Sequence, residues 1–198
     1  MGGSFIITHI NEEILKEFQI IYGTPKLSYP YQDFDNFEYK TFKGCKNYYI
    51  MNKWNGMNVL FYKYFDKDGN GFISAKSKGT PFLANTDYGE FLNLTLLSLD
   101  DKNVSKKEKL NPNGLFRDQA GFLIPKVDLF NSPPNFFIKK LANDKNIQSM
   151  SFELCGQKEP HLVYYDFDIK LQPYFIKLIK VKLHQSLKKS TKITFMDQ

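Results

Sequence analysis

A turn-rich segment, residues 66–71, separates two runs of residues that favour β-strands. The run before it, residues 58–65, is rich in aromatic and aliphatic side chains, and Phe72 and Ile73 begin the run after it. Aromatic and β-branched residues favour strands, and Asp and Gly tolerate the positive φ angles of tight hairpin turns. The sequence therefore predicts a β-hairpin, and a fold that contains antiparallel strands.

The same turn-rich segment also resembles a calcium loop, because Asp66, Asp68 and Asn70 stand at alternate positions. An EF-hand loop needs a bidentate glutamate at its twelfth position, where this chain has Ser77. The flanks of an EF-hand are helices, whereas these flanks are strand-like. A hairpin turn is therefore the better prediction, and a calcium loop is the weaker alternative.

Lys53 opens a K-x-x-G tetrapeptide just before this hairpin. Strand-like residues 48–51 precede it, so we expect Lys53 at a strand end, sheltered yet reachable, with Gly56 allowing a tight turn beside it. Burial and neighbouring cations such as Lys76 or Lys78 would lower the pKa of such a lysine, and a neutral amine can attack phosphorus or a carbonyl carbon. A hairpin lysine that points to water is the simpler alternative, because K-x-x-G tetrapeptides often arise by accident.

Three segments have helix-like patterns. Asn11 is a suitable cap for a helix over residues 11–21, in which four apolar side chains fall on one face: Ile14, Leu15, Phe18 and Ile21. Asp87 is a suitable cap for a second packing helix over residues 87–97. A third, short helix is predicted over residues 132–141, because proline is tolerated in the first helical turn.

The last third of the chain returns to strand-like residues. Strands are predicted at 149–154, 161–165 and 175–183, with residues 192–195 as a returning partner. A basic amphipathic helix over 175–183 is the alternative, because the lysines there fit neither the two-residue period of a strand nor the 3.6-residue period of a helix well. Strands joined by hairpin turns outnumber strand–helix–strand units, so we predict an α+β fold with mixed, mainly antiparallel sheets.

Composition limits the class of protein. A chain of 198 residues with 42% hydrophobic residues can bury one core, so residues 1–198 are expected to form a single domain. No apolar run is long enough to span a membrane, and the start of the chain lacks the pattern of a signal peptide. The two cysteines, Cys45 and Cys155, suggest no disulfide framework or zinc site. These features predict a cytoplasmic or nuclear protein that is neither secreted nor embedded in a membrane.

The charge of the chain favours an anionic partner. Lysine and arginine total 27 against 21 acidic residues, a formal net charge of +6. Arg117 is the only arginine, and lysine reads base edges poorly, which argues against sequence-specific DNA recognition. An A/T-rich genome would produce the same lysine-rich composition without any functional cause.

Three short motifs occur in order along the chain: K-x-x-G at 53–56, S-K-G at 77–79 and F-E-x-x-G at 152–156. Together they resemble the first motifs of the covalent nucleotidyltransferases, and most closely those of the ATP-dependent RNA ligases of the phage type. The resemblance covers residues 48–166. It implies an α+β nucleotidyltransferase domain, of the ATP-grasp-like ligase kind, whose sheets flank a nucleotide cleft.

The resemblance also implies roles for individual residues. Lys53 would attack the α-phosphate of ATP and form a lysyl-AMP intermediate for joining RNA ends, while Mg²⁺ neutralises the departing pyrophosphate. Glu153 would contact the nucleotide sugar and help to hold the metal. Gly56 would complete the lysine motif, and Lys78 would meet phosphate. The structural alternatives are a surface carboxylate at Glu153 and a solvated lysine at Lys78.

Adenine would stack on an aromatic side chain, for which Tyr165 and Phe175 are the candidates. The chain has 12 tyrosines and 19 phenylalanines, and most aromatic residues in strands are core residues. The sequence therefore does not choose between these two.

Two later motifs of the family are missing from their expected places. No E-x-x-[VI]-x-K motif follows Phe167, and the K-x-K at 180–182 precedes any such motif. The sequence is therefore expected to hold the first part of an adenylyltransferase domain, truncated or degenerate and nearly inert in self-adenylylation. A catalytically inactive relative that binds nucleotide or RNA is the second hypothesis, and an α+β domain with accidental motifs is the third.

Overall fold

The computed structural model describes residues 3–24, 52–85, 90–99, 115–117, 123–125, 128–159, 162–178 and 193–194. The elements in these parts are, in chain order, β1 Phe5–Ile10, β2 Glu13–Ile21, β3 Met57–Phe65, β4 Gly71–Lys76, α1 Phe91–Ser98, β5 Leu115–Arg117, β6 Leu123–Pro125, α2 Phe136–Asn143, β7 Ile147–Cys155, β8 Lys170–Leu178 and β9 Ile193–Thr194. They form an α+β fold, as the sequence predicts. Neither helix is long and apolar enough to cross a membrane in the part of the chain described.

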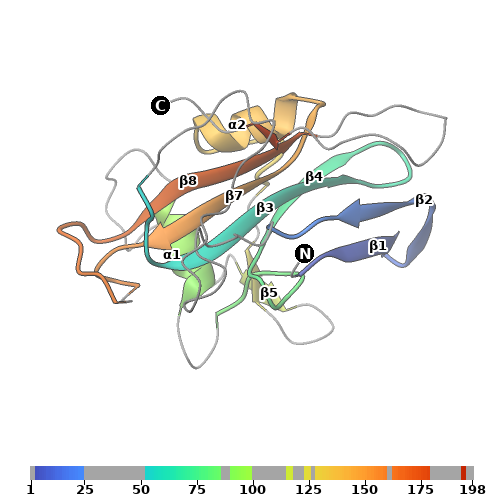
Figure 1. The fold of residues 1–198 in the computed structure, drawn as a ribbon. Coiled ribbons are helices and arrows are strands. Elements are labelled where there is room, and N and C mark those ends of the chain that lie inside the picture. The colour runs from blue at the N-terminus through green and yellow to red at the C-terminus, as the bar shows by residue number, and fades with distance from the viewer. Residues whose placement is uncertain are drawn as a thin grey trace, which may run out of the picture.

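A five-stranded sheet with the order β4-β3-β7-β8-β9 is the centre of the fold (Figure 1). All its neighbouring strands are antiparallel, including β3 and β7, which are far apart in the sequence. The strands β1 and β2 form a separate two-stranded sheet, as do β5 and β6. The prediction of mainly antiparallel sheets is therefore confirmed.

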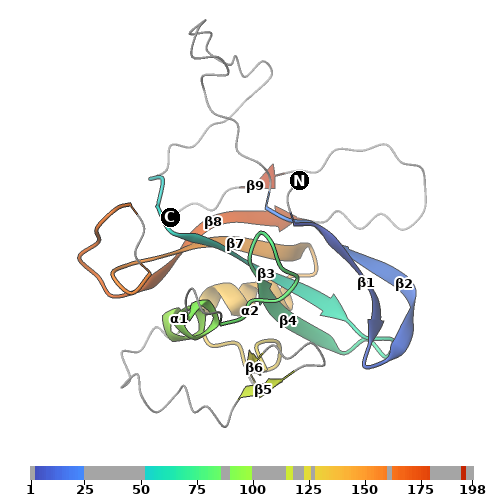
Figure 2. The ribbon, with the colours of Figure 1, turned by 90° about the horizontal axis from the view of Figure 1, so that it is seen from below.

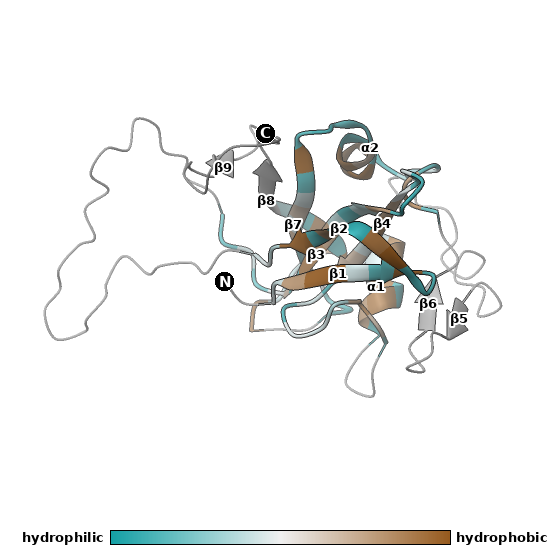
Figure 3. Cartoon of the chain, turned by 90° about the vertical axis from the view of Figure 1, so that its right-hand side faces the viewer, coloured by the Kyte–Doolittle hydropathy of each residue, from teal (hydrophilic) through white to brown (hydrophobic). Residues whose placement is uncertain are grey.

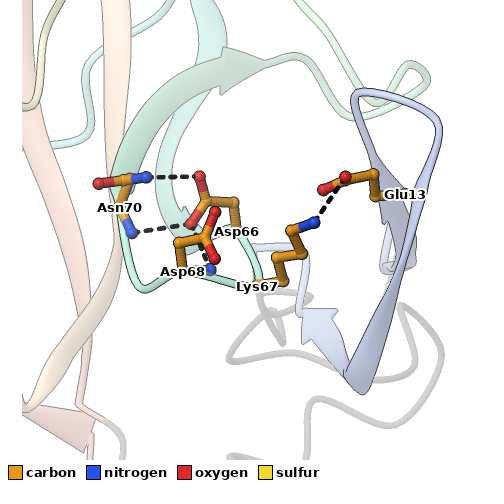
Figure 4. A network of polar contacts seen from close by, with 5 residues as sticks. All are labelled: Glu13, Asp66, Lys67, Asp68 and Asn70. Carbon is orange, nitrogen blue, oxygen red and sulfur yellow. Dashed lines mark hydrogen bonds and ion pairs between the residues drawn. The ribbon is translucent and has the colours of Figure 1, made fainter.

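The predicted hairpin is β3 and β4, which pair from Phe65 with Gly71 to Leu60 with Lys76. Its turn is held by the carboxylate of Asp66, which accepts hydrogen bonds from the main-chain N–H groups of Asp68 at 2.9 Å and Asn70 at 2.8 Å (Figure 4). These contacts satisfy the carboxylate within the turn. The hairpin prediction is confirmed, and the flanking elements are strands rather than the helices of an EF-hand.

The hydrophobic core lies between one face of the central sheet and the two helices. Alternate residues of β3 and β7 point to this face, and their buried side chains pack against residues of α1 and α2. Figure 2 shows both helices on this side of the sheet. The ring of Phe152 on β7 contacts both Phe61 on β3 and Phe137 on α2, with centroids 5.6 Å apart in each pair. Figure 3 shows hydrophobic stretches on the strands of this sheet.

The predicted helix over residues 11–21 is wrong, because this segment belongs to a β-hairpin of β1 and β2. Asn11 and Glu12 form the two-residue turn with positive φ angles of 50° and 67°, and such angles suit hairpins and not helices. The side chain of Gln19 exchanges two hydrogen bonds with the main chain of Phe65, at 2.6 and 2.9 Å. This tertiary contact fixes the hairpin against the end of β3.

Both core helices begin later than predicted. The helix α1 starts at Phe91, and the side-chain oxygen of Asn85 accepts hydrogen bonds from the N–H groups of Leu92 and Asn93, both at 3.1 Å. Asp87, the predicted cap, lies outside the described residues. The helix α2 starts at Phe136 because Asn135 caps it, accepting a hydrogen bond from the N–H of Ile138 at 3.0 Å.

The C-terminal strands agree only in part with the prediction. Residues 149–154 are within β7, but the described residues 162–165 form no strand, and the next strand is β8, which starts at Lys170. The predicted strand over 175–183 is confirmed as far as Leu178, within β8, and Ile193–Thr194 pairs with β8 as the predicted returning partner. Residues 48–51 and 179–183 lie outside the described residues.

Candidate functional site

The K-x-x-G segment lies immediately before β3. Lys53 is exposed and stands four residues before Met57, the first residue of the strand. The expectation that Lys53 is sheltered is therefore wrong, although the lysine is reachable, and the strand-like residues 48–51 that precede it lie outside the described residues. Among the described residues, no hydrogen bond or ion pair involves its side chain.

Asn55 anchors this segment to the loop between β7 and β8. The hydroxyl of Tyr165 accepts a hydrogen bond from the N–H of Asn55 at 2.7 Å and donates one to its carbonyl oxygen at 3.1 Å. The side-chain oxygen of Asn55 also accepts a hydrogen bond from the N–H of Leu162 at 3.3 Å. These three contacts, across more than a hundred positions of sequence, hold the main chain two residues from Lys53.

Glu153 also contacts this segment, at Gly56. Its carboxylate accepts a hydrogen bond from the N–H of Gly56 at 3.2 Å, and it is in register with Asn58 across the β3–β7 pair. A Cβ atom at position 56 would overlap the carbonyl oxygen of Leu154, so only glycine fits this close approach. The lysine motif and the glutamate motif are therefore in direct contact.

A polar network continues from Glu153 along the sheet face that is opposite the core. The amide of Asn58 donates a hydrogen bond to the hydroxyl of Ser151 at 2.8 Å and accepts one from the hydroxyl of Thr24 at 2.8 Å. The hydroxyls of Thr24 and Ser151 lie 3.0 Å apart. Our sequence reasoning missed these three residues. The alternation of polar Ser149, Ser151 and Glu153 in β7 was the signal that could have found one of them, Ser151.

Aromatic rings pack beside the K-x-x-G segment. The ring centroid of Tyr165 lies 5.8 Å from that of Trp54 and 5.0 Å from that of Phe167, on which it stacks. The ammonium group of Lys170 lies 4.3 Å from the centroid of Phe167. Tyr165, a predicted adenine-stacking residue, thus has ring contacts within the protein and a hydroxyl that binds Asn55.

The S-K-G segment follows β4, whose last residue Lys76 is in register with Leu60 near the start of β3. Lys78 is exposed, and the hydroxyls of Ser77 and Thr80 lie 3.0 Å apart within the turn. Lys76 is buried, and its ammonium group donates a hydrogen bond to the carbonyl oxygen of Ser77. Burial lowers the pKa of Lys76 below its usual range.

The structure brings some predicted site residues together and leaves others apart. Glu153 and Tyr165 form hydrogen bonds with the segment that carries Lys53 and Gly56. Lys78 follows β4 toward the same part of the sheet, with no hydrogen bond or ion pair to these residues in the described structure. Phe175 is in β8, in register with Ser151, and its side chain lies outside what the structure describes.

The described residues contain no group of three or more His, Cys, Asp or Glu side chains that could hold a metal ion. Magnesium, however, is often bound by one or two carboxylates together with substrate phosphates and water. Glu153 fits the role of that single carboxylate, and not that of a member of a metal cage formed by protein alone.

Comparisons with protein-family models, with curated proteins and with solved structures return no match for this chain.

Proposed function

We propose that this chain is an RNA ligase-like adenylyltransferase that accepts AMP from ATP on Lys53 and passes it to an RNA end. The observation that carries the proposal is the hydrogen bond from the Gly56 N–H to the Glu153 carboxylate at 3.2 Å. It joins the K-x-x-G and F-E-x-x-G motifs, which are 97 positions apart. Motifs that occur by accident are not expected to contact each other in the fold, whereas the motifs of one nucleotide site must lie close together.

In the proposed reaction the neutral amine of Lys53 attacks the α-phosphorus of ATP. A nitrogen–phosphorus bond forms, the bond from the α-phosphorus to the bridging oxygen breaks, pyrophosphate leaves, and the amine proton passes to solvent. An RNA phosphate oxygen then attacks the same phosphorus and releases the lysine. Storing AMP on the protein divides one difficult condensation into easier steps.

The residues around Lys53 would position it and the nucleotide. Tyr165 forms hydrogen bonds with the main chain of Asn55, and Glu153 accepts one from the main chain of Gly56. The segment after the lysine is therefore fixed at two consecutive residues. Glu153 would also meet the nucleotide sugar and Mg²⁺, which when bound would neutralise the leaving pyrophosphate. Lys78 is exposed at the end of β4 and would contact phosphate.

A nucleotide- or RNA-binding relative without covalent chemistry is the second candidate. The exposure of Lys53 favours it, because the burial that would help to activate this amine is missing around it. Both candidates require a nucleotide or RNA to bind near Gly56 and Glu153, but only the first requires a covalent adenylate.

Incubation with ATP labelled at the α-phosphate, followed by a denaturing gel, separates the two candidates. The first candidate predicts a labelled band with Mg²⁺, weak because the two later motifs are missing, that is lost in Lys53→Ala and kept in Lys16→Ala, a variant of an exposed lysine in β2. ATP binding by calorimetry without any labelled band would favour the second candidate. The absence of both binding and labelling would contradict the proposed function.

A further inference from the structure

The loop between β7 and β8 exposes three consecutive large apolar side chains. Leu162 is 95% exposed, Val163 46% and Tyr164 83%. We call residues 162–168 the aromatic loop, because Tyr164, Tyr165 and Phe167 are part of it. Exposed apolar side chains that are contiguous mark interaction surfaces more often than single exposed residues do.

The aromatic loop is held by hydrogen bonds at several points. The side-chain amide of Gln157 donates to the Tyr164 hydroxyl and to the Tyr165 carbonyl oxygen, both at 3.1 Å. Main-chain bonds join Gln157 to Phe167 at 3.0 Å and Lys158 to Asp168 at 2.9 Å. The exposed ring of Tyr164 is therefore presented by an ordered loop, which lowers the entropy lost when a partner binds.

This loop is also bound to the segment that carries Lys53. The side chain of Asn55 accepts a hydrogen bond from the Leu162 N–H, its main-chain N–H donates one to the Tyr165 hydroxyl, and its carbonyl oxygen accepts one from that hydroxyl. A molecule that lies on the aromatic loop is therefore next to the lysine motif. For a ligase, that position is where an RNA end must come.

Three lysines lie beside the aromatic loop, and the two that are not paired with a loop carboxylate, Lys170 and Lys53, favour a polyanion. The ammonium group of Lys170 lies over the ring of Phe167 at 4.3 Å, and Lys53 is exposed on the adjoining segment. Lys158 neutralises Asp168 in an ion pair at 3.2 Å, which leaves Asp166 as the other exposed acid of the loop. The whole chain carries a formal charge of +6, which also attracts nucleic acid.

We propose that the aromatic loop is a stacking platform for an unpaired base of single-stranded RNA, with Tyr164 as the stacking residue and Lys170 attracting the RNA backbone. An exposed aromatic ring stacks on any base, so such a platform tolerates different sequences. This proposal rests on the proposed function, because it assigns the surface that receives the RNA substrate.

Fluorescence anisotropy with a fluorescein-labelled single-stranded RNA of about ten nucleotides tests the platform at low salt. Tyr164→Ala is expected to raise the Kd by about 5- to 150-fold, the range for loss of one stacked base. Tyr164→Phe keeps the ring and is expected to bind as the wild type does. Phe18→Ala removes an aromatic ring that is 62% exposed on β2, away from the loop, and should leave the Kd unchanged.

A blunt RNA duplex offers no unpaired base, so Tyr164→Ala should bind it as the wild type does. Equal affinity of Tyr164→Ala and wild type for single-stranded RNA would overturn the platform, and would leave the exposed loop to a protein partner. No RNA binding by the wild type would overturn it as well. Binding that depends on Tyr164, without adenylation of Lys53, would keep the platform and reject the ligase proposal.

Discussion

The carboxylate of Glu153 accepts a hydrogen bond from the main-chain N–H of Gly56, with 3.2 Å between oxygen and nitrogen. The contact depends on the antiparallel pairing of β3 and β7, which aligns Asn58 with Glu153. Because Gly56 ends the K-x-x-G tetrapeptide, the carboxylate also positions the chain that leads back to Lys53.

Substitutions of Glu153 should separate its structural role from its chemical role. Glu153→Ala leaves the part-buried Gly56 N–H without this acceptor and should lower the free energy of unfolding by about 1–3 kcal/mol. Glu153→Gln keeps an oxygen acceptor and should lower it by less. Urea unfolding measures both values. If the carboxylate acts on the nucleotide, Glu153→Gln should also lose ATP labelling, and full labelling in this variant would contradict that role.

Gly56 should tolerate no side chain. In Gly56→Ala the new methyl group would overlap the carbonyl oxygen of Leu154, so β3 and β7 must separate, at an expected loss of about 3 kcal/mol in the free energy of unfolding. Gly79→Ala is a matched control, because a Cβ there meets nothing within 4 Å. Thermal unfolding should place the control close to the wild type, and similar losses in both variants would contradict the close approach.

The buried Lys76 should make stability depend on pH. Burial lowers the pKa of Lys76 in the folded state, so between that pKa and the ordinary lysine value the unfolded chain binds more protons. The free energy of unfolding contributed by this group therefore rises as the pH rises through its folded-state pKa toward about 10.5. Lys76→Met keeps a long side chain without the charge and should reduce this rise.

The prediction compares the pH-dependent rise in the free energy of unfolding between the wild type and Lys76→Met, because other groups titrate in the same pH range. Burial raises the pKa of Cys155 to about 11, so the contribution of this thiol to the free energy of unfolding falls as the pH rises from about 9. Burial also lowers the pKa of Lys63, whose contribution changes with pH in the same direction as that of Lys76. Both groups are present in the variant and in the wild type. Urea unfolding at pH 7 and near pH 10 should show the smaller rise in Lys76→Met, and identical rises would contradict the assignment.

The local pattern of the sequence was sufficient for the β3–β4 hairpin. Asp66 both favours the turn by residue type and closes it with its own carboxylate, so no distant residue had to be known. The segment 11–21 shows the opposite case. Its apolar spacing suits a helix, but the positive φ angles of Asn11 and Glu12 and the contacts of Gln19 with Phe65 favour a hairpin.

The candidate site was predictable only as far as its motifs. The resemblance indicated Lys53, Gly56 and Glu153, and the distance between Gly56 and Glu153 agrees with a shared site. The supporting contact of Tyr165 with Asn55 has no local signal, because a tyrosine hydroxyl that binds a main chain 110 positions away follows from the tertiary fold alone. The hydrogen bonds of Tyr165 with Asn55 help to explain why residues 162–165 form a loop, although their composition favours a strand.

The most direct test of the account is peptide mapping by mass spectrometry after incubation with ATP and Mg²⁺. The proposed function predicts an AMP adduct at low yield on the peptide that contains Lys53, because the two later motifs of the family are missing from their expected places, and no adduct in Lys53→Ala. This variant should unfold within about 0.5 kcal/mol of the wild type, because the lysine is exposed. An AMP adduct on a different residue, or one that persists in Lys53→Ala, would contradict the claim that Lys53 is the nucleophile.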